Sequence, residues 1–136
     1  MKRSEIFERT ESAVESVCES SRDVVAVYLF GSFVRGEEDE QSDIDIGILF
    51  RDYSIDKLLK LFRRIDEELD IEREVDVRAL NNSGPEFPFK VISKGKLLYE
   101  TNASERADYE QYFERRYHDM KPLIEDYRSE MKARLV

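Results

Sequence analysis

Residues 24 to 50 read VVAVYLFGSFVRGEEDEQSDIDIGILF, and this stretch decides the fold of the chain. Its two hydrophobic runs, 24–30 and 44–50, have the length and composition of buried β-strands. The first run leads directly into Gly31-Ser32, a pair typical of a tight turn between a strand and a helix. Asp43-Ile44-Asp45 opens the second run. The pattern therefore predicts two strands joined through a turn that can approach an anion, with paired carboxylates at the start of the second strand.

The two aspartates have a geometry suited to cations. Side chains alternate between the faces of a strand, so Asp43 and Asp45 share one face, with Cα atoms ~6.5 Å apart. Mg²⁺ is usually held by one or two carboxylates, and water and substrate phosphates fill its other positions. Gly47 follows on the same face. We expect that no bulky side chain blocks approach along this surface.

The turn before the aspartates adds groups that bind phosphate. Gly31 lets the backbone bring N–H groups close to an anion, and Ser32 adds a hydroxyl at the start of a short helix. Gly36 is expected to end that helix. A Gly-Ser pair alone is compatible with an ordinary loop, and Asp-x-Asp alone with an exposed strand edge. Their combination at this spacing indicates a site for a phosphate group and a metal ion.

A third carboxylate follows from another alternating segment. In residues 72–80, Val75 and Val77 are expected to face a core, and Asp76 between them faces away. If this strand lies beside the strand of Asp43 and Asp45, Asp76 shares their face. The alternative is an ordinary solvated face.

The quoted motifs resemble a known signature. Gly31-Ser32, ten further residues and Asp43-Ile44-Asp45 are similar to the polymerase-beta-like nucleotidyltransferase superfamily, and GSFVRG and SDIDIGILF resemble most closely its minimal nucleotidyltransferases, which are commonly paired with HEPN-domain toxins. The resemblance extends more weakly over residues 24–100. It implies an α/β (α+β) fold, a small mixed sheet flanked by helices in the manner of the polymerase beta palm, with C-terminal helices. It also favours Asp76 over Glu74 as the third metal-binding residue.

The resemblance implies a Mg²⁺-dependent nucleotidyltransferase that moves AMP from ATP to a tyrosine of a HEPN toxin and so acts as an antitoxin. Two Mg²⁺ ions are expected, with Mn²⁺ as a substitute. The implied catalytic and metal-binding residues are Asp43, Asp45 and Asp76, and the implied nucleotide-binding residues are Gly31, Ser32, Arg35, Gly36 and Ser42. Two alternatives remain: a small-molecule nucleotidyltransferase of the aminoglycoside type, and an antitoxin that neutralises its partner by contact alone.

Several basic side chains have two interpretations. Arg35 either meets a triphosphate oxygen or pairs with a neighbouring glutamate of the turn. Lys90 and Lys94 either reach phosphates or are ordinary surface residues. His118, the single histidine, fits a surface position in a charged helix better than a general base.

Composition limits the remaining possibilities. A chain of 136 residues with 40% hydrophobic content is expected to form one domain, residues 1–136, with a core at about 22–100. Its net charge of −9 lacks the basic footprint that nucleic-acid polymers require, and suits a basic protein partner or a small cationic acceptor. No apolar run or signal-peptide pattern indicates a membrane, so we expect a cytoplasmic protein. Cys18 has no partner for a disulfide and is expected in the core.

The rest of the chain predicts further elements. Residues 4–20, with Ser4 as the N-cap, and residues 54–69 have helical periodicity. Residues 85–94 form a short helix or a loop, and 96–100 a last strand. Residues 103–133 are helical, with Pro122 opening a second helix or kinking a long one. This segment either packs on the domain or forms an arm for a partner, and it leaves a homo-oligomer possible.

Overall fold

A computed structural model describes residues 2–37 and 42–135. It contains one mixed sheet of four strands in the order β3-β2-β1-β4. The central strands β1 (Val24–Phe30) and β2 (Ile44–Phe50) are antiparallel, and they are the two hydrophobic runs of the quoted stretch. β3 (Val75–Ala79) is parallel to β2, and β4 (Lys96–Glu100) is antiparallel to β1. The expected small mixed sheet is confirmed.

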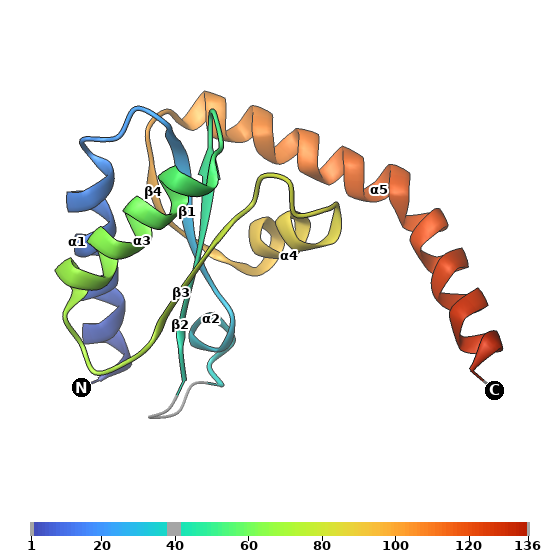
Figure 1. The fold of residues 1–136 in the computed structure, drawn as a ribbon, viewed down its shortest axis with the longest axis horizontal. Helices are drawn as coiled ribbons and strands as arrows, with labels where there is room; N and C mark the ends of the chain where they lie inside the picture. Colours follow the sequence, from blue (N-terminus) through green and yellow to red (C-terminus); the bar gives the residue numbers. More distant parts are fainter. Residues whose placement is uncertain (1, 38–41, 136) are drawn as a thin grey trace.

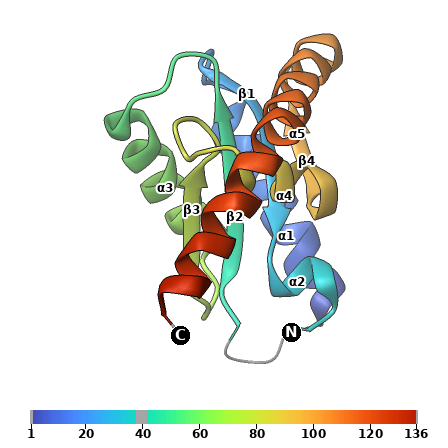
Figure 2. The same ribbon diagram turned by 90° about the vertical axis from the view of Figure 1, so that its right-hand side faces the viewer.

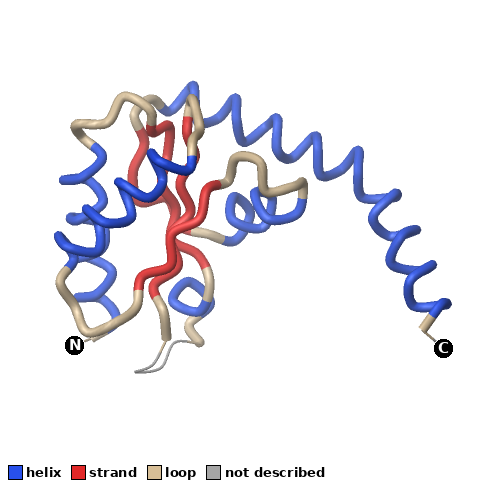
Figure 3. Tube along the Cα trace, viewed as in Figure 1, coloured by secondary structure: helices blue, strands red, loops and turns tan. Residues whose placement is uncertain are grey.

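Helices cover both faces of the sheet, as Figures 1 and 3 show. α1 (Arg3–Cys18) and α3 (Ile55–Leu69) lie on one face. α4 (Glu86–Lys94) and the first part of α5 (Ala103–Arg134) lie on the other. The short α2 (Ser32–Arg35) follows β1 directly. The expectation of an α+β domain with a helical C-terminal segment therefore holds.

Each face of the sheet has its own hydrophobic core. The isoleucines of β2 alternate with its other residues and pack under α1 and α3, in a cluster that also holds the fully buried Cys18. Burial raises the pKa of the Cys18 thiol to about 12. A smaller cluster on the opposite face joins Leu49, Leu80, Val91 and Phe113 to β1. Because both faces of β1 are covered, its residues are apolar without alternation.

The aspartate face of β2 is covered beyond its first residues. A Cβ on Gly47 would lie 2.8 Å from Leu80 Cδ1 and 3.4 Å from Val91 Cγ1. The expectation that Gly47 leaves this face open is therefore wrong, because Val91 of α4 and Leu80, the residue after β3, pack directly on the glycine. The accessible part of the face is limited to the end of the sheet at Asp45.

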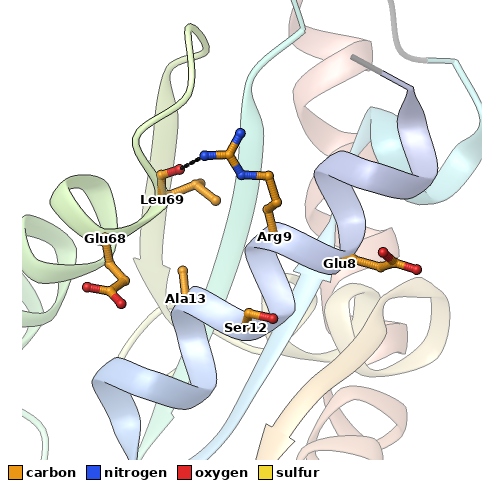
Figure 4. A pocket seen from close by; sticks show the side chains of 6 residues that line it. All are labelled: Glu8, Arg9, Ser12, Ala13, Glu68 and Leu69. Atoms are coloured by element: carbon orange, nitrogen blue, oxygen red, sulfur yellow. Dashed lines mark hydrogen bonds between the residues drawn. The ribbon is translucent and has the colours of Figure 1, made fainter.

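The ends of α1 and α3 are fixed by specific contacts. Arg9 of α1 donates to the carbonyl of Leu69 at 3.2 Å, satisfying an acceptor in the last turn of α3, beside the shallow cavity drawn in Figure 4. Ser54 caps α3 by accepting from the Lys57 amide at 3.2 Å. Ser4 does not cap α1, because the helix starts one residue earlier and its N-cap is Lys2.

The first part of α5 is anchored to the sheet. The buried Tyr28 hydroxyl donates to Glu110 at 2.7 Å, and Arg106 bonds both Glu110 and Glu100 of β4. Burial, reinforced by Glu110, raises the pKa of Tyr28. Phe113, only 5% exposed, adds the apolar contact. These contacts join α5 to the layer formed by α4.

The last part of α5 projects from the domain on the side of α4, as Figures 1 and 2 show. The segment is one helix with Pro122 inside it, so of the two alternatives predicted, the single long helix is the one observed, and no second helix begins at Pro122. Proline removes one helical hydrogen bond and bends the helix without ending it. Leu123 and Tyr127 are 62% and 64% exposed, while Arg128 bonds Glu86 of α4 at 2.6 and 2.7 Å. The first part of α5 therefore packs on the domain, and its last part projects from it.

None of the helices in the described ranges is both long and apolar enough to span a bilayer.

Candidate active site

A cavity of about 450 Å³ opens where β1, β2 and β3 meet α2 and α4. Its walls combine two carboxylates, four cationic side chains and an apolar side. The lining residues are Phe30, Gly31, Val34, Arg35, Asp45, Asp76, Arg78, Phe87, Lys90, Val91 and Lys94. The quoted stretch and the third predicted strand therefore contribute to one site.

The parallel pairing of β2 and β3 brings two aspartates together. Asp45 is the register partner of Asp76, and both line the cavity. The neighbouring pairs, Ile44 with Val75 and Ile46 with Val77, place apolar side chains on the opposite face. The alternation of both strands thus forces the two carboxylates onto the same face. Asp43 precedes β2 and is exposed.

The carboxylates repel one another. The pKa of Asp45 is raised, first because the group is partly buried and then because Asp76 and Asp43 place negative charge beside it. Arg35 and Arg78 oppose this rise. The carboxylates therefore repel one another within the site, and a cation bound between them would relieve this repulsion.

Gly31 allows the backbone to touch the Asp45 carboxylate. Its φ of +79° and ψ of −151° belong to a region that is essentially restricted to glycine. A Cβ at this position would lie 2.1 Å from Asp45 Oδ2. Gly36, with a left-handed φ of +75°, is the C-cap of α2, so the expected end of the short helix is confirmed.

The carboxylates fit a divalent metal by the chemistry of their donor atoms. Asp45 and Asp76 offer adjacent hard oxygen ligands, and one or two carboxylates are the usual protein contribution to Mg²⁺. Within residues 2–37 and 42–135, no three acidic, histidine or cysteine side chains already form a metal-binding group. Asp43 acts on the charge of Asp45 but does not line the cavity. A three-carboxylate site is therefore not preformed, and the roles assigned to these residues stay predictions.

The other predicted nucleotide-binding residues divide into two groups. Gly31 and Arg35 line the cavity, whereas Ser32, Gly36 and Ser42 are not among its lining residues. The predicted pairing of Arg35 with a neighbouring glutamate is confirmed, because it pairs with Glu37 at 2.9 Å in an exposed contact, whereas its role toward a triphosphate stays a prediction. Exposed pairs of this kind contribute little energy. Arg35 can therefore exchange its partner for a ligand at small cost.

Three residues that line the cavity were not assigned a function from the sequence: Arg78, Phe30 and Phe87. Arg78 lies on the cavity wall, with its guanidinium carbon 3.7 Å from the centre of the Phe87 ring. Phe30 meets the same ring edge-on at 5.3 Å. The alternation of the strand predicts Arg78 on the face of Asp76, two residues away, but no functional role was assigned to it from the sequence. The aromatic residues gave no such signal, because apolar residues near glycine are ordinarily structural.

The remaining cationic candidates also have defined places. Lys90 and Lys94 lie on α4, which the structure shows as a helix, and both line the cavity. His118 lies on α5 with its ring edge-on to Phe89 at 5.5 Å, and it is not part of the cavity wall. The structure therefore gives His118 no position for a general base in this site.

Comparisons with solved structures show the same fold. A toxin–antitoxin structure described as MntA-HepT superposes with a TM-score of 0.66 at 20% identity, covering 94% of this chain and 97% of the other. A tri-AMPylated Shewanella oneidensis HEPN toxin in complex with an MNT antitoxin gives 0.67 at 21%, with coverages of 95% and 98%. A toxin–antitoxin structure with AMP-PNP gives 0.62 at 23%, with coverages of 92% and 94%.

The comparison with curated proteins gave no significant match. The family model described as Polymerase beta, Nucleotidyltransferase matches residues 12–104. This range contains all four strands and every residue that lines the cavity. The chain therefore belongs to the polymerase beta nucleotidyltransferase family.

Proposed function

We propose that this chain is a Mg²⁺-dependent adenylyltransferase that transfers AMP from ATP to a tyrosine hydroxyl of a HEPN toxin, and so acts as an antitoxin. The observation that carries the proposal is the register pairing of Asp45 with Asp76 inside a cavity lined by Gly31 and four cations. The similar structures support the reaction, since one contains an AMPylated HEPN toxin and another contains AMP-PNP.

The proposed reaction is an in-line displacement at the α-phosphorus. The tyrosine oxygen forms a bond to that phosphorus, the bond to the bridging oxygen breaks, and pyrophosphate leaves with the electron pair. The hydroxyl proton passes to a carboxylate, and the exposed Asp76 is the accessible group on the cavity wall. Asp43, Asp45 and Asp76 would hold Mg²⁺, which stabilises charge on the phosphate oxygens when bound.

The turn after β1 has groups for the phosphates. The amides of Val34 and Arg35 both bond the Gly31 carbonyl, so the amides of Ser32 and Phe33 come before the first hydrogen bonds of the helix. Together with the Ser32 hydroxyl, these amides are the proposed donors to phosphate oxygens. Ser42 and Gly36 stay candidates for the same role through their place in the family motif.

The rival function is neutralisation by contact alone, and a double variant separates the two. We expect Asp43→Asn/Asp45→Asn to keep its fold and its toxin binding but to lose neutralisation of the toxin's activity. The measurement is toxin activity after incubation with MgATP and either the wild-type chain or the variant. Equal neutralisation by the variant would refute the enzymatic proposal and establish the contact mechanism.

A further inference from the structure

The cavity has a charge opposite to that of the chain. Its walls carry Arg35, Arg78, Lys90 and Lys94 against Asp45 and Asp76. The whole chain has a net charge of −9. The local excess of positive charge would remain even with both carboxylates ionised. Such a cavity attracts a compact, strongly anionic ligand, while the acidic remainder of the surface disfavours a long polyanion.

The four cations reach the cavity from different elements. Arg78 lies on β3, two residues after Asp76, and its guanidinium carbon is 3.7 Å from the centre of the Phe87 ring of α4. Arg35 is the last residue of α2, and Lys90 and Lys94 lie on α4. Arg78 therefore connects the strand that carries Asp76 with the helix that carries the two lysines.

Lys90 and Lys94 have a suitable helical arrangement. They are four residues apart, and side chains at this spacing lie on the same face of a helix. α4 is packed against the sheet, because Val91 is buried and a Cβ on Gly95, at the end of the helix, would lie 3.0 Å from the Leu29 carbonyl oxygen of β1. The two ammonium groups are thus presented from a fixed helix.

Both lysines also lack the partners that other basic side chains have. Lys57, Arg51, Arg106 and Arg128 each pair with a carboxylate. Over the ranges that the structure describes, Lys90 and Lys94 make no ion pair, although the chain has 31 acidic residues against 22 basic ones. Their charges remain available to a ligand.

We propose that Lys90 and Lys94 bind the β- and γ-phosphates of the nucleoside triphosphate and that Arg78 faces its α-phosphate. The triphosphate then runs from the carboxylates toward α4. Charge-assisted contacts to phosphate are the interactions that two such lysines provide. This inference rests on the proposed function only for the place of the reacting phosphorus at Asp45 and Asp76.

Direct binding measurements test the lysines. The affinities of ATP and of AMP, each with Mg²⁺, are measured by calorimetry for the wild type, Lys90→Met, Lys94→Met and the double variant. We expect each single change to weaken ATP binding about tenfold, and the double change about a hundredfold, with AMP binding unchanged. Lys60→Met is the matched control, since it removes the same charge from an exposed site on α3, and it should leave both affinities unchanged.

The possible results separate this inference from the proposed function. Equal losses for ATP and AMP, no loss in the double variant, or an equal loss in Lys60→Met would each overturn the triphosphate assignment. A wild-type chain that binds ATP no more tightly than AMP would overturn it too. If the lysine variants lose ATP binding while the wild type transfers no AMP, the inference stands and the proposed function fails. Thermal unfolding confirms that each variant is folded.

Discussion

Replacing Gly31 by alanine gives a sharp prediction, because the added methyl group meets Asp45 directly. The new Cβ would lie 2.1 Å from Asp45 Oδ2 and 3.0 Å from its Cγ. Ordinary contacts at a Cβ begin at 3.4 Å, so the carboxylate oxygen must move by more than 1 Å. An aspartate side chain can rotate, so the substitution displaces the carboxylate without breaking the core.

The size of the effect differs between activity and stability. A misplacement of about 1 Å at a reacting group can lower the rate about 100-fold, so we expect AMP transfer to fall by about that factor. The φ of +79° adds backbone strain of about 1–3 kcal/mol to the folded state. We therefore expect a modest loss in the free energy of unfolding and a much larger loss in activity.

Gly84→Ala is the matched control for Gly31→Ala. Gly84 has nearly the same φ, +78°, but no atom lies within 4 Å of the Cβ position. It should lose a similar free energy of unfolding in urea while keeping its rate of transfer from α-labelled ATP. The reasoning is refuted if Gly31→Ala transfers AMP at the wild-type rate, or if Gly84→Ala loses as much activity.

Three further substitutions test other parts of the account. Asp45→Asn should abolish transfer but raise the stability of the ligand-free protein at neutral pH. Because the folded-state pKa of Asp45 is raised, ionisation of this carboxyl destabilises the wild-type fold above that pKa. The excess of the variant's free energy of unfolding in urea over that of the wild type should therefore shrink as the pH falls through this pKa. An excess that grows on acidification would contradict the prediction. Phe113→Ala should cost about 3–5 kcal/mol in urea unfolding, while the exposed Leu123→Ala costs less than about 0.5 kcal/mol; equal costs would mean that Phe113 does not anchor α5. Asn81→Ala should cost about 1–3 kcal/mol, because the Asn81 amide bonds both the N–H and the carbonyl of Phe50, at 2.8 and 2.9 Å; an unchanged urea midpoint would show that water replaces both bonds.

The sequence predicts those parts of the fold in which local pattern and burial agree. The uninterrupted apolar run of β1 and the alternation of β3 gave the strands, and together with β2 they gave the shared face of Asp45 and Asp76. The end of α2 at Gly36 was also readable, because a left-handed C-cap favours glycine strongly.

The errors arose where tertiary packing overrides the local pattern. In α3 the apolar residues Ile55 and Leu59 are 55% and 51% exposed, whereas Leu61 is buried, so helical periodicity alone does not identify the buried face. The apolar face of an amphipathic helix is broad, so the sequence alone does not show which apolar residues at its margins are buried. Gly47 is a similar case. Only the tertiary packing shows that Leu80 and Val91 occupy the space beside this glycine.

The cation cluster was harder to predict than the carboxylates. Lys90 and Lys94 come from a helix far along the chain, and their position in the same cavity as Asp45 depends on how α4 packs against the sheet. No spacing rule within one segment encodes that arrangement. The net charge of −9 concealed it further, because an average over the chain does not show a local excess of positive charge.

The most direct test of the central claim is label transfer from α-labelled ATP with Mg²⁺ to a purified HEPN toxin from the same genome. The account predicts that the wild-type chain places AMP on a toxin tyrosine and releases pyrophosphate, whereas folded Asp45→Asn and Asp76→Asn variants leave the toxin unlabelled. Labelling by either variant at the wild-type rate, or neutralisation of the toxin by the wild type without any label, would contradict it.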